Sequence, residues 1–548
     1  MTPFHRKLAG CAATALMLIS LPAWGQSDPV VQAPAGAVEG RLDGAVRVFK
    51  GLPYAQPPVG VARWTPPRPL SAWAGIRKAT EFGPACFQPT QAMASVYAEP
   101  PPPMSEDCLS LNIWAPAAAD KAPVFVWIHG GALSSGSSRQ AIYDGAKLAR
   151  QGVIVVSINY RLGVLGYLAH PDLSAQSPLG ISGNYGLLDQ IEALRWVQRN
   201  IAAFGGDPAN VTIAGESAGG LSVLYLMAAP SARGLFAKAI AESSYMISTP
   251  ELRRPRFGEM ASETIGATVT VRLGAHTIGD LRAMDARTLT NAAAAAGFPP
   301  FATIDGRILP RQIAEVFDRG EQAPVPVLAG FNSGEIRSLR FLAPHAPSSA
   351  AAYEGAIRDR YRDLADAFLK LYPSDNLQES VLAATRDGLY GWTAERLVAK
   401  QAALGLPAYL YFFDHGYPAA DSAGLHGFHA SELPFVFGTA ERLAPAWPKP
   451  PSTPAETALS DAMIGYWTSF AKTGAPEASG QPKWPAYGSG QAYMAFTDAP
   501  HASAHLLPGM YPLHEAVVCR RRAQGNTPWN WNIGLQSPRI PAEAAGCP

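Results

Sequence analysis

Residues 211–220 read VTIAGESAGG, and this stretch decides the fold. Val211–Ala214 are typical of a short strand, and the residues after Ser217 can continue as a helix. Gly215 and Gly219 flank Ser217 at minus two and plus two, where a sharp turn would bring neighbouring Cβ atoms into contact. The pattern therefore predicts a strand, a tight turn and a helix that present the Ser217 hydroxyl as a nucleophile. The helix N-terminus would favour negative charge developing beside it.

The composition indicates a globular protein with no bias toward a charged partner. The chain has 548 residues, of which 48% are hydrophobic and 16% charged, and its formal net charge is +1. This balance excludes a disordered chain and gives no reason to expect nucleic-acid binding. Length alone would suggest three or four domains.

The N-terminal residues are typical of a secretory signal. Arg6 and Lys7 form a basic region, Leu8–Leu21 an apolar core, and Ala23–Gly25 a small-x-small cleavage site. We therefore expect residues 1–25 to be a signal peptide and the mature chain to begin at Gln26, in the periplasm or outside the cell. The apolar core is too short for a stable membrane span.

A lipoprotein signal is the alternative for the same segment. Residues 8–11, which end at Cys11, resemble a bacterial lipoprotein processing site. An apolar segment should precede that cysteine, but here the apolar core follows it. The secretory signal therefore explains the segment better.

Four cysteines remain after the predicted cleavage, and an even number in an exported chain implies disulfides. Proximity in sequence favours Cys86 with Cys108 and Cys519 with Cys547. The first pair closes a loop of about twenty residues, worth about 3 kcal/mol in the chain-entropy model. The four cysteines lack the short paired spacing of zinc sites, so no metal is expected.

The pattern along the chain predicts an α/β protein. Residues 122–128 and 153–160 are continuous apolar runs, typical of strands buried on both faces of a parallel sheet. Residues 185–204 carry apolar side chains at helical spacing. Further strands are expected at 237–242, 325–330 and 409–413. Residues 250–320 and 345–405 have a helical pattern and are expected to form insertions that cover a site.

A serine nucleophile also needs N–H donors for the oxyanion that forms on attack. The strand at 122–128 runs into His129–Leu133, a glycine-rich loop of the kind that supplies such donors. Its small residues allow the backbone to approach a substrate closely. We therefore predict that the N–H groups of Gly131 and Ala132, with that of Ala218 directly after the nucleophile, form the oxyanion hole.

Seven stretches together resemble the type B carboxylesterase family, which includes cholinesterases, animal carboxylesterases and secreted microbial esterases. They cover the chain from about residue 35 to residue 500. The resemblance implies an α/β-hydrolase fold, with a large, mostly parallel central sheet flanked by helices and helical insertions over an active-site gorge. The stretches are GLPYAQPPVG (51–60), SEDCLSLNIW (105–114), WIHGGALSSG (127–136), NYRLGVLGYL (159–168), residues 183–220, AGFNSGEI (329–336) and HASELPFVFG (429–438).

The resemblance supplies the other two members of a catalytic triad. The family places a glutamate after a strand in a G-x-N-x-x-E pattern, which here ends at Glu335. The family usually has Asp-Glu-Gly there, whereas this chain has Gly-Glu-Ile, which puts the local loop geometry in doubt. His429 opens the segment that resembles the family's catalytic-histidine segment. His426, three residues earlier, is the competing histidine.

Two further residues are carried over from the family. The resemblance implies that Glu216 is an acidic neighbour of the nucleophile and that Ser243 is a buried serine near the triad; each could instead be purely structural. The predicted site parts span about 300 residues and must converge. We therefore expect one catalytic domain over residues 26–548 rather than several.

Specificity is less visible in the sequence. We expect Leu133 and Phe331 to line the acyl side of the pocket, and the loop between Cys86 and Cys108 to form part of its rim. That loop has no tryptophan at residues 87–107, although in cholinesterases it carries one, so a choline ester is not expected. Arg337 and Arg340 could meet an acidic substrate group or be a solvated pair.

The combined prediction is a secreted serine carboxylesterase that forms an acyl-enzyme on Ser217 and needs no cofactor. Its partner would be a small ester, with neither nucleic acid nor a membrane span involved, and the sequence leaves its oligomeric state open. A lipase-like hydrolase of acylglycerols and a non-catalytic adhesion protein of the same fold are the alternatives. Because only neutral His429 can act as a base, the rate should fall below about pH 6 to 7.

Overall fold

The computed structural model describes residues 1–2, 28–90, 95–529 and 532–547. The predicted signal peptide, residues 1–25, lies outside the described residues except for its first two. Among the described residues, no helix is both long and apolar enough to cross a membrane.

A twisted sheet of eleven strands forms the centre of the described structure, in the order β16-β15-β14-β13-β12-β11-β9-β10-β8-β4-β3. In this spatial order, all neighbouring strands between β15 and β10, β9 included, pair in parallel. Antiparallel strands complete the sheet, with β16 at one edge and β8, β4 and β3 at the other. The predicted mostly parallel sheet is confirmed. The strands are β3 (Arg41–Asp43), β4 (Val46–Pro53), β8 (Ser110–Pro116), β9 (Ala122–Ile128), β10 (Ile154–Ile158), β11 (Gly206–Glu216), β12 (Lys238–Glu242), β13 (Val327–Asn332), β14 (Ala408–Phe413), β15 (Ala492–Phe496) and β16 (Pro500–Ala504).

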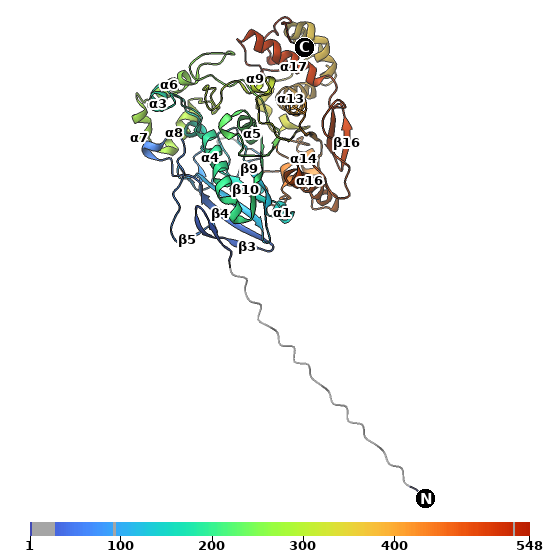
Figure 1. Ribbon diagram of the computed structural model, residues 1–548. Helices are drawn as coiled ribbons and strands as arrows, with labels where there is room; N and C mark the ends of the chain where they lie inside the picture. The colour runs from blue at the N-terminus through green and yellow to red at the C-terminus, as the bar shows by residue number, and fades with distance from the viewer. Residues whose placement is uncertain (3–27, 91–94, 530–531, 548) are drawn as a thin grey trace.

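Small pairings lie outside this sheet. A three-stranded sheet joins β1 (Val30–Ala33), β2 (Gly36–Glu39) and β5 (Ile76–Lys78), and a short parallel pair joins β6 (Ala85–Cys86) to β7 (Met104–Ser105). In Figure 1 the ribbon β3–β4 lies at the lower end of the molecule, and α13 and α17 lie at the upper end.

The apolar runs form strands because both faces of the sheet are covered. In β9, Val124 and Val126 belong to the core on one face, together with residues of α4 and α5. Phe125 and Trp127 belong to the core on the other face, together with residues of α16. Successive side chains of a strand point to opposite faces, so a strand buried on both has no polar alternation.

Two long insertions are helical, as predicted. Residues 250–320 contain α6 to α9, and residues 345–405 contain α10 to α13. The helices are α1 (Ala146–Arg150), α2 (Gly163–Tyr167), α3 (Pro171–Gln176), α4 (Tyr185–Asn200), α5 (Ala218–Ala228), α6 (Ser262–Arg272), α7 (Ile278–Ala283), α8 (Ala286–Ala295), α9 (Ile313–Asp318), α10 (Ala350–Tyr361), α11 (Ala365–Leu371), α12 (Leu377–Arg386), α13 (Trp392–Ala403), α14 (Pro418–Ser422), α15 (Leu433–Val436), α16 (Pro454–Thr473) and α17 (Met510–Gln524).

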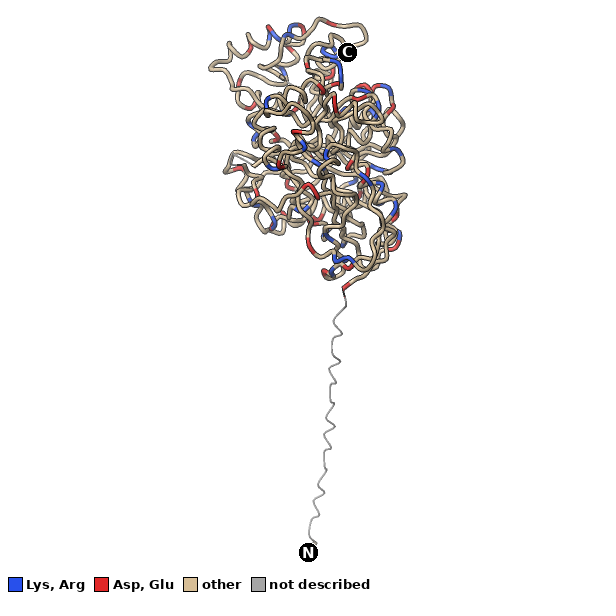
Figure 2. The backbone as a smooth tube through the Cα atoms, turned by 90° about the vertical axis from the view of Figure 1, so that its left-hand side faces the viewer, with Lys and Arg blue, Asp and Glu red and all other residues tan. Residues whose placement is uncertain are grey.

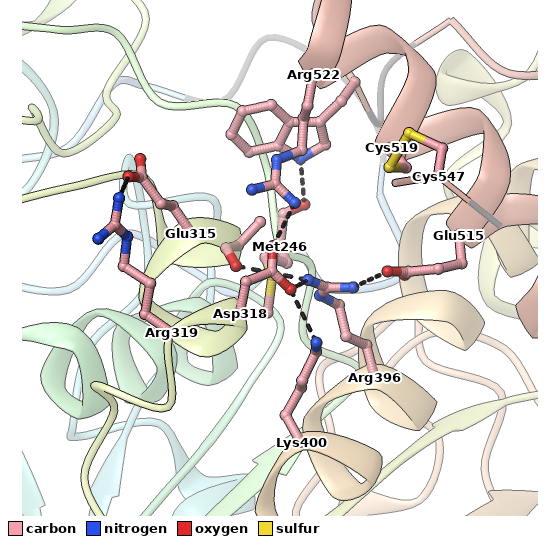
Figure 3. A network of polar contacts seen from close by, with 12 residues as sticks. Met246, Glu315, Asp318, Arg319, Arg396, Lys400, Glu515, Cys519, Arg522 and Cys547 are labelled. Carbon is pink, nitrogen blue, oxygen red and sulfur yellow. Dashed lines mark hydrogen bonds and ion pairs between the residues drawn. A yellow bond between two sulfur atoms is a disulfide. The ribbon is translucent and has the colours of Figure 1, made fainter. Parts of the chain in front are cut away.

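Both predicted disulfides are present. Cys86 and Cys108 are joined across 22 residues, and Cys519 and Cys547 across 28. The second holds the C-terminal segment to α17 beside a network of charged side chains (Figure 3). Acidic and basic residues are interspersed over the whole backbone trace (Figure 2), in keeping with the net charge of +1.

Candidate active site

Ser217 sits between β11 and α5 in a backbone conformation that side chains rarely adopt. Its φ and ψ are 57° and −121°, and its N–H donates to the carbonyl of Glu242 at 3.0 Å. A Cβ added to Gly219 would lie 2.0 Å from the carbonyl oxygen of Ile128, and one added to Gly215 would lie 2.5 Å from the carbonyl carbon of Gly219. Both flanking glycines are therefore required, and the predicted strand, tight turn and helix are confirmed. Strain of this kind is a common property of functional positions.

Glu335 and His429 form a buried pair. Glu335 follows β13, is fully buried, and binds His429 Nδ1 through Oε2 in a short hydrogen bond. Its other oxygen, Oε1, accepts the backbone N–H of Asn332 at 2.8 Å. The Asn332 side chain in turn donates to the carbonyl of Phe428 at 2.9 Å. The carboxylate is thus held from two sides, and it fixes the orientation of the imidazole.

Gly334, which directly precedes Glu335 where the family usually has aspartate, has a structural role. The N–H of Gly334 donates to the carbonyl of Gly427 at 2.7 Å, joining the loop of the acid to the loop of the histidine. A Cβ on Gly334 would lie 2.6 Å from the carbonyl oxygen of Leu425. Glycine at this position lets the two loops meet, so the departure from the family pattern is compatible with a paired Glu335 and His429.

His426 lies apart from this pair. Its imidazole binds Asp421 Oδ1 at 2.7 Å and Asp414 Oδ1 at 3.1 Å, and its side chain is 41% exposed. The hydrogen bond to Asp414 is the main cause that raises the pKa of His426 to about 9. His429, in contrast, lines the cavity that also contains Ser217. The structure thus places His429, rather than His426, beside the candidate nucleophile.

Glu216 faces the other nitrogen of the same imidazole. His429 Nε2 lies 3.0 Å from Glu216 Oε1, and both side chains are buried. Burial by itself lowers the pKa of His429, but the carboxylates of Glu216 and Glu335 outweigh it and raise the pKa to about 9. The fall in rate expected below about pH 6 to 7 is therefore moved to higher pH, toward 9. Within the described residues, no hydrogen bond joins His429 to the Ser217 hydroxyl. Catalytic hydrogen bonds are often long or misaligned in a site without substrate.

We predict that Glu216→Gln moves the acid limb of the kcat/KM profile to lower pH, by about one unit or more. Removing a negative charge beside the imidazolium lowers the pKa of His429, so the neutral base becomes available at lower pH. The measurement is kcat/KM for a neutral ester from pH 5 to 10. Glu81→Gln, at a side chain 82% exposed, is the control and should leave the midpoint unchanged. An unchanged or raised midpoint in Glu216→Gln would contradict the prediction.

The glycine-rich loop after β9 lies against the serine turn. Gly131 and Ala132 line the cavity, with φ values of 105° and 55°. Their N–H groups have no backbone acceptor among the described residues, so they are available to a ligand. His129 anchors the loop: its ring stacks on Tyr160 at 4.6 Å, and the Tyr160 hydroxyl donates to the His129 carbonyl. Burial lowers the pKa of His129 to about 4, so this histidine is neutral.

Ala218 is the first residue of α5 and is fully buried beside Ser217. The N–H groups in the first turn of a helix have no intrahelical acceptor. Such a group and the helix dipole both favour negative charge. The geometry is compatible with the predicted role of Ala218 as the third donor.

Two tyrosines that the sequence did not identify contact the histidine. The Tyr97 hydroxyl, from the loop between Cys86 and Cys108, donates to the carbonyl of His429 at 2.8 Å and lies 2.7 Å from the Ser338 hydroxyl. The Tyr390 ring lies 5.3 Å from the His429 ring, on a π-helical turn at residues 387–391. Such turns are frequent at functional sites but have no sequence signature that would have revealed this one.

The cavity over the serine has a volume of about 790 Å³, a typical size for a small-molecule site. Its wall is mainly apolar and aromatic, and the loop between Cys86 and Cys108 contributes a large share, as predicted. No group of three or more His, Cys, Asp or Glu side chains in the described ranges could hold a metal ion. Apart from residues already named, the wall includes Pro100, Pro101, Pro102, Tyr143, Tyr245, Phe301, Leu339, Phe341, Leu389, Leu433 and Trp447.

Two residues predicted to line the pocket do not reach it. Leu133 and Phe331 are fully buried in the main hydrophobic core and are absent from the cavity wall. Phe331 belongs to β13 and packs edge-on against Phe412 of the neighbouring strand. Leu133, with φ of 55°, stands between the wall residues Ala132 and Ser134, but its side chain is buried in the core. Leu133 and Phe331 are close in sequence to the oxyanion loop and to Glu335, but the prediction that they line the pocket is wrong.

The two arginines after Glu335 also lie off the cavity wall. Arg337 pairs with Glu379 at 2.7 Å, and Arg340 donates to Gln378 at 3.0 Å on the surface. The possibility that they meet an acidic substrate group is therefore not supported. Ser243 is fully buried with φ of 43°, and its hydroxyl has no hydrogen-bond partner among the described residues.

Comparison with known proteins shows the family to which the chain belongs. A family model described as the carboxylesterase family matches residues 27–508. The chain is 36% identical to fumonisin B1 esterase of Sphingopyxis macrogoltabida over 85% of this chain and 87% of the relative. It is 37% identical to para-nitrobenzyl esterase of Bacillus subtilis (strain 168) over 84% of this chain and 92% of the relative. The structure of Geobacillus stearothermophilus carboxylesterase EST55 superposes with a TM-score of 0.72 and 34% identity, covering 88% of this chain and 99% of that one.

Proposed function

The chain belongs to the carboxylesterase family and is a carboxylic ester hydrolase, and from this premise we propose that it acts through an acyl-enzyme on Ser217. One observation carries the proposal. The strained Ser217 and the imidazole of His429, held by Glu335, meet at the wall of one cavity. Each part comes from a different segment of the chain, and the acid and base follow the nucleophile in the order typical of this fold.

In the proposed reaction, the Ser217 hydroxyl attacks the ester carbonyl while His429 Nε2 accepts its proton. Glu335 holds the ring through Nδ1 and stabilises the imidazolium. His429 then donates the proton to the leaving alcohol. A water molecule, activated by the same imidazole, attacks the acyl-enzyme and releases the acid.

The negative oxygen of each tetrahedral intermediate would lie between the oxyanion loop and the start of α5. The N–H groups of Gly131, Ala132 and Ala218 are the proposed donors there. When the Ser217 hydroxyl binds His429 Nε2, the Glu216 carboxylate would give up its contact with that nitrogen. Its negative charge would still stabilise the imidazolium that forms during the reaction.

A panel of p-nitrophenyl esters of increasing acyl length tests the proposed function. We expect hydrolysis of short and medium esters at rates well above the buffer reaction, and none of the panel should need an added metal. The absence of hydrolysis across the panel would refute the proposal. Rate measured through the solubility limit separates an esterase, which shows saturation, from the lipase alternative, which shows a jump.

We also propose that the protein is exported and that residues 26–548 form one catalytic domain. Two disulfides, which persist in oxidising compartments, support export. N-terminal sequencing of the protein recovered from the periplasm or medium should begin at Gln26. An N-terminus at Met1 in a cytoplasmic fraction would refute this part of the proposal.

A further inference from the structure

Apart from His429, the described wall of the active-site cavity contains a single basic side chain, that of Arg287. Arg287 is the second residue of α8, and no other lysine or arginine of the described chain lines the cavity. The rest of the wall is mainly apolar. An isolated guanidinium in such a place is a strong candidate for recognition of an anionic group.

Arg287 forms no ion pair with an acidic side chain among the described residues. The carboxylate of Asp285, two residues earlier, caps α8 by accepting the N–H of Thr288 at 2.9 Å and the Thr288 hydroxyl at 3.1 Å. These hydrogen bonds, with a smaller contribution from the Arg287 charge, lower the pKa of Asp285. No ion pair or hydrogen bond of the Arg287 side chain is found within the described ranges. Because the Arg287 guanidinium forms no ion pair within the described structure, it is available to bind an anionic group of a ligand.

The guanidinium is nevertheless held in place. Its central carbon lies 5.5 Å from the ring centroid of Phe87, which directly follows the disulfide-bonded Cys86. The Thr90 N–H donates to the Asn291 side chain at 2.9 Å, which ties the same loop to α8. Cation–π stacking on a tethered loop restricts the guanidinium while leaving its N–H groups free.

The acidic residues of the wall do not neutralise this charge. Glu216 is paired with His429 deep in the cavity. Glu99 lies in the same wall, where burial raises its pKa while Gln140 and Arg139 favour its charged form. Each of these carboxyl groups already has polar partners, whereas the Arg287 guanidinium makes no ion pair or hydrogen bond among the described side chains, so its charge is available to a ligand.

We propose that Arg287 forms a subsite for a free carboxylate on the ester substrate, remote from the bond that is cleaved. The preferred substrates are then esters that carry a second, ionised carboxyl group. The guanidinium, which is exposed to solvent at the cavity wall, can bind it through two parallel hydrogen bonds. This inference rests on the proposed function, because it assigns a substrate class to the same site.

Matched pairs of esters test the subsite. In one pair, 4-nitrophenyl hydrogen glutarate carries the carboxylate on the acyl side, and 4-nitrophenyl pentanoate is its neutral counterpart of equal length. In the other pair, 4-carboxyphenyl butanoate carries it on the alcohol side, and phenyl butanoate is neutral. For each variant the measured quantity is the ratio of kcat/KM for the charged ester to that for the neutral one.

Arg287→Gln should lower this ratio about tenfold in at least one pair, mainly through KM, while neutral esters change less than about twofold. Arg287→Lys should retain part of the preference, because it keeps the charge but loses the planar fork. Arg340→Gln, on the surface and off the cavity wall, is the matched control and should change neither ratio. The wild-type ratio should also fall as salt is raised from 0.02 to 0.5 M.

Unchanged ratios in both pairs for Arg287→Gln would overturn the subsite, as would equal losses in Arg287→Gln and Arg340→Gln. These outcomes are distinct from failure of the proposed function, which would abolish hydrolysis of the neutral esters by the wild type. Retained hydrolysis of neutral esters by Arg287→Gln shows that this variant is folded.

Discussion

Ser217→Ala should lower kcat/KM for p-nitrophenyl esters by a factor of about 10⁴ or more. In the proposed reaction the Ser217 hydroxyl forms the bond to the acyl carbon, and alanine has no atom that could replace it. Because the side chain is small and lies at the cavity wall, the unfolding midpoint should remain close to that of the wild type. Near-normal ester hydrolysis by the folded variant would exclude Ser217 as the nucleophile.

The two neighbouring histidines provide a matched comparison for this prediction. His429→Ala should lose about as much activity as Ser217→Ala, and the double variant should lose little more, because residues that act as a unit are not additive. His426→Ala, three residues earlier on the same segment, removes an imidazole of equal size that lies between Asp414 and Asp421. It should keep activity within about tenfold. Equal losses in the two histidine variants would mean that the segment acts only through its structure.

Arg396→Met should have the largest effect on stability, lowering the free energy of unfolding by about 3 kcal/mol. The Arg396 side chain is fully buried and binds Asp318 and Glu515 (Figure 3). Methionine fills most of the volume but leaves these carboxylates without their shared partner. Lys400 and Arg522 still contact Asp318, at 2.9 and 2.6 Å, which limits the loss. The measurement is chemical denaturation at pH 7, followed by fluorescence.

Arg319→Met is the control for this prediction. Arg319 lies in the same region (Figure 3) and pairs with Glu315 at 3.1 Å, but its side chain is 52% exposed. Exposed pairs are worth about 0 to 1 kcal/mol, so this variant should be nearly as stable as the wild type. Similar losses of unfolding free energy in the two variants would show that the buried ion pairs of Arg396 stabilise the protein no more than an exposed pair. The network is relevant to the site because α13, which carries Arg396, begins two residues after Tyr390 of the cavity wall.

Much of the fold could be predicted because its signals are local. The serine turn needs glycine at two defined positions, and the continuous apolar runs can only be strands covered on both faces. The two disulfides could be paired from proximity in sequence. The predicted helical insertions are confirmed, but the bounds of their individual helices and the π-helical turn that contains Tyr390 depend on packing, which the helical pattern of the sequence does not specify.

The candidate site was predictable only where a motif carries the chemistry. Glu335 and His429 stand in recognisable segments, and the structure places them in contact. The cavity wall has no such motif. Leu133 and Phe331 are close in sequence to the oxyanion loop and to Glu335, yet their side chains do not line the cavity. Side chains next to a catalytic residue in the chain often point into the core. Arg287, on α8 far from every motif, reaches the wall only through the fold.

Active-site labelling by a fluorophosphonate tests the central claim most directly. The reagent reacts with a serine only when an adjacent base and oxyanion donors activate it. We expect one adduct per chain, located by peptide mass spectrometry on Ser217. The adduct should form at an unchanged rate in His426→Ala, far more slowly in His429→Ala, and not at all in Ser217→Ala. An adduct on another residue, or labelling of Ser217→Ala at the wild-type rate, would contradict the account.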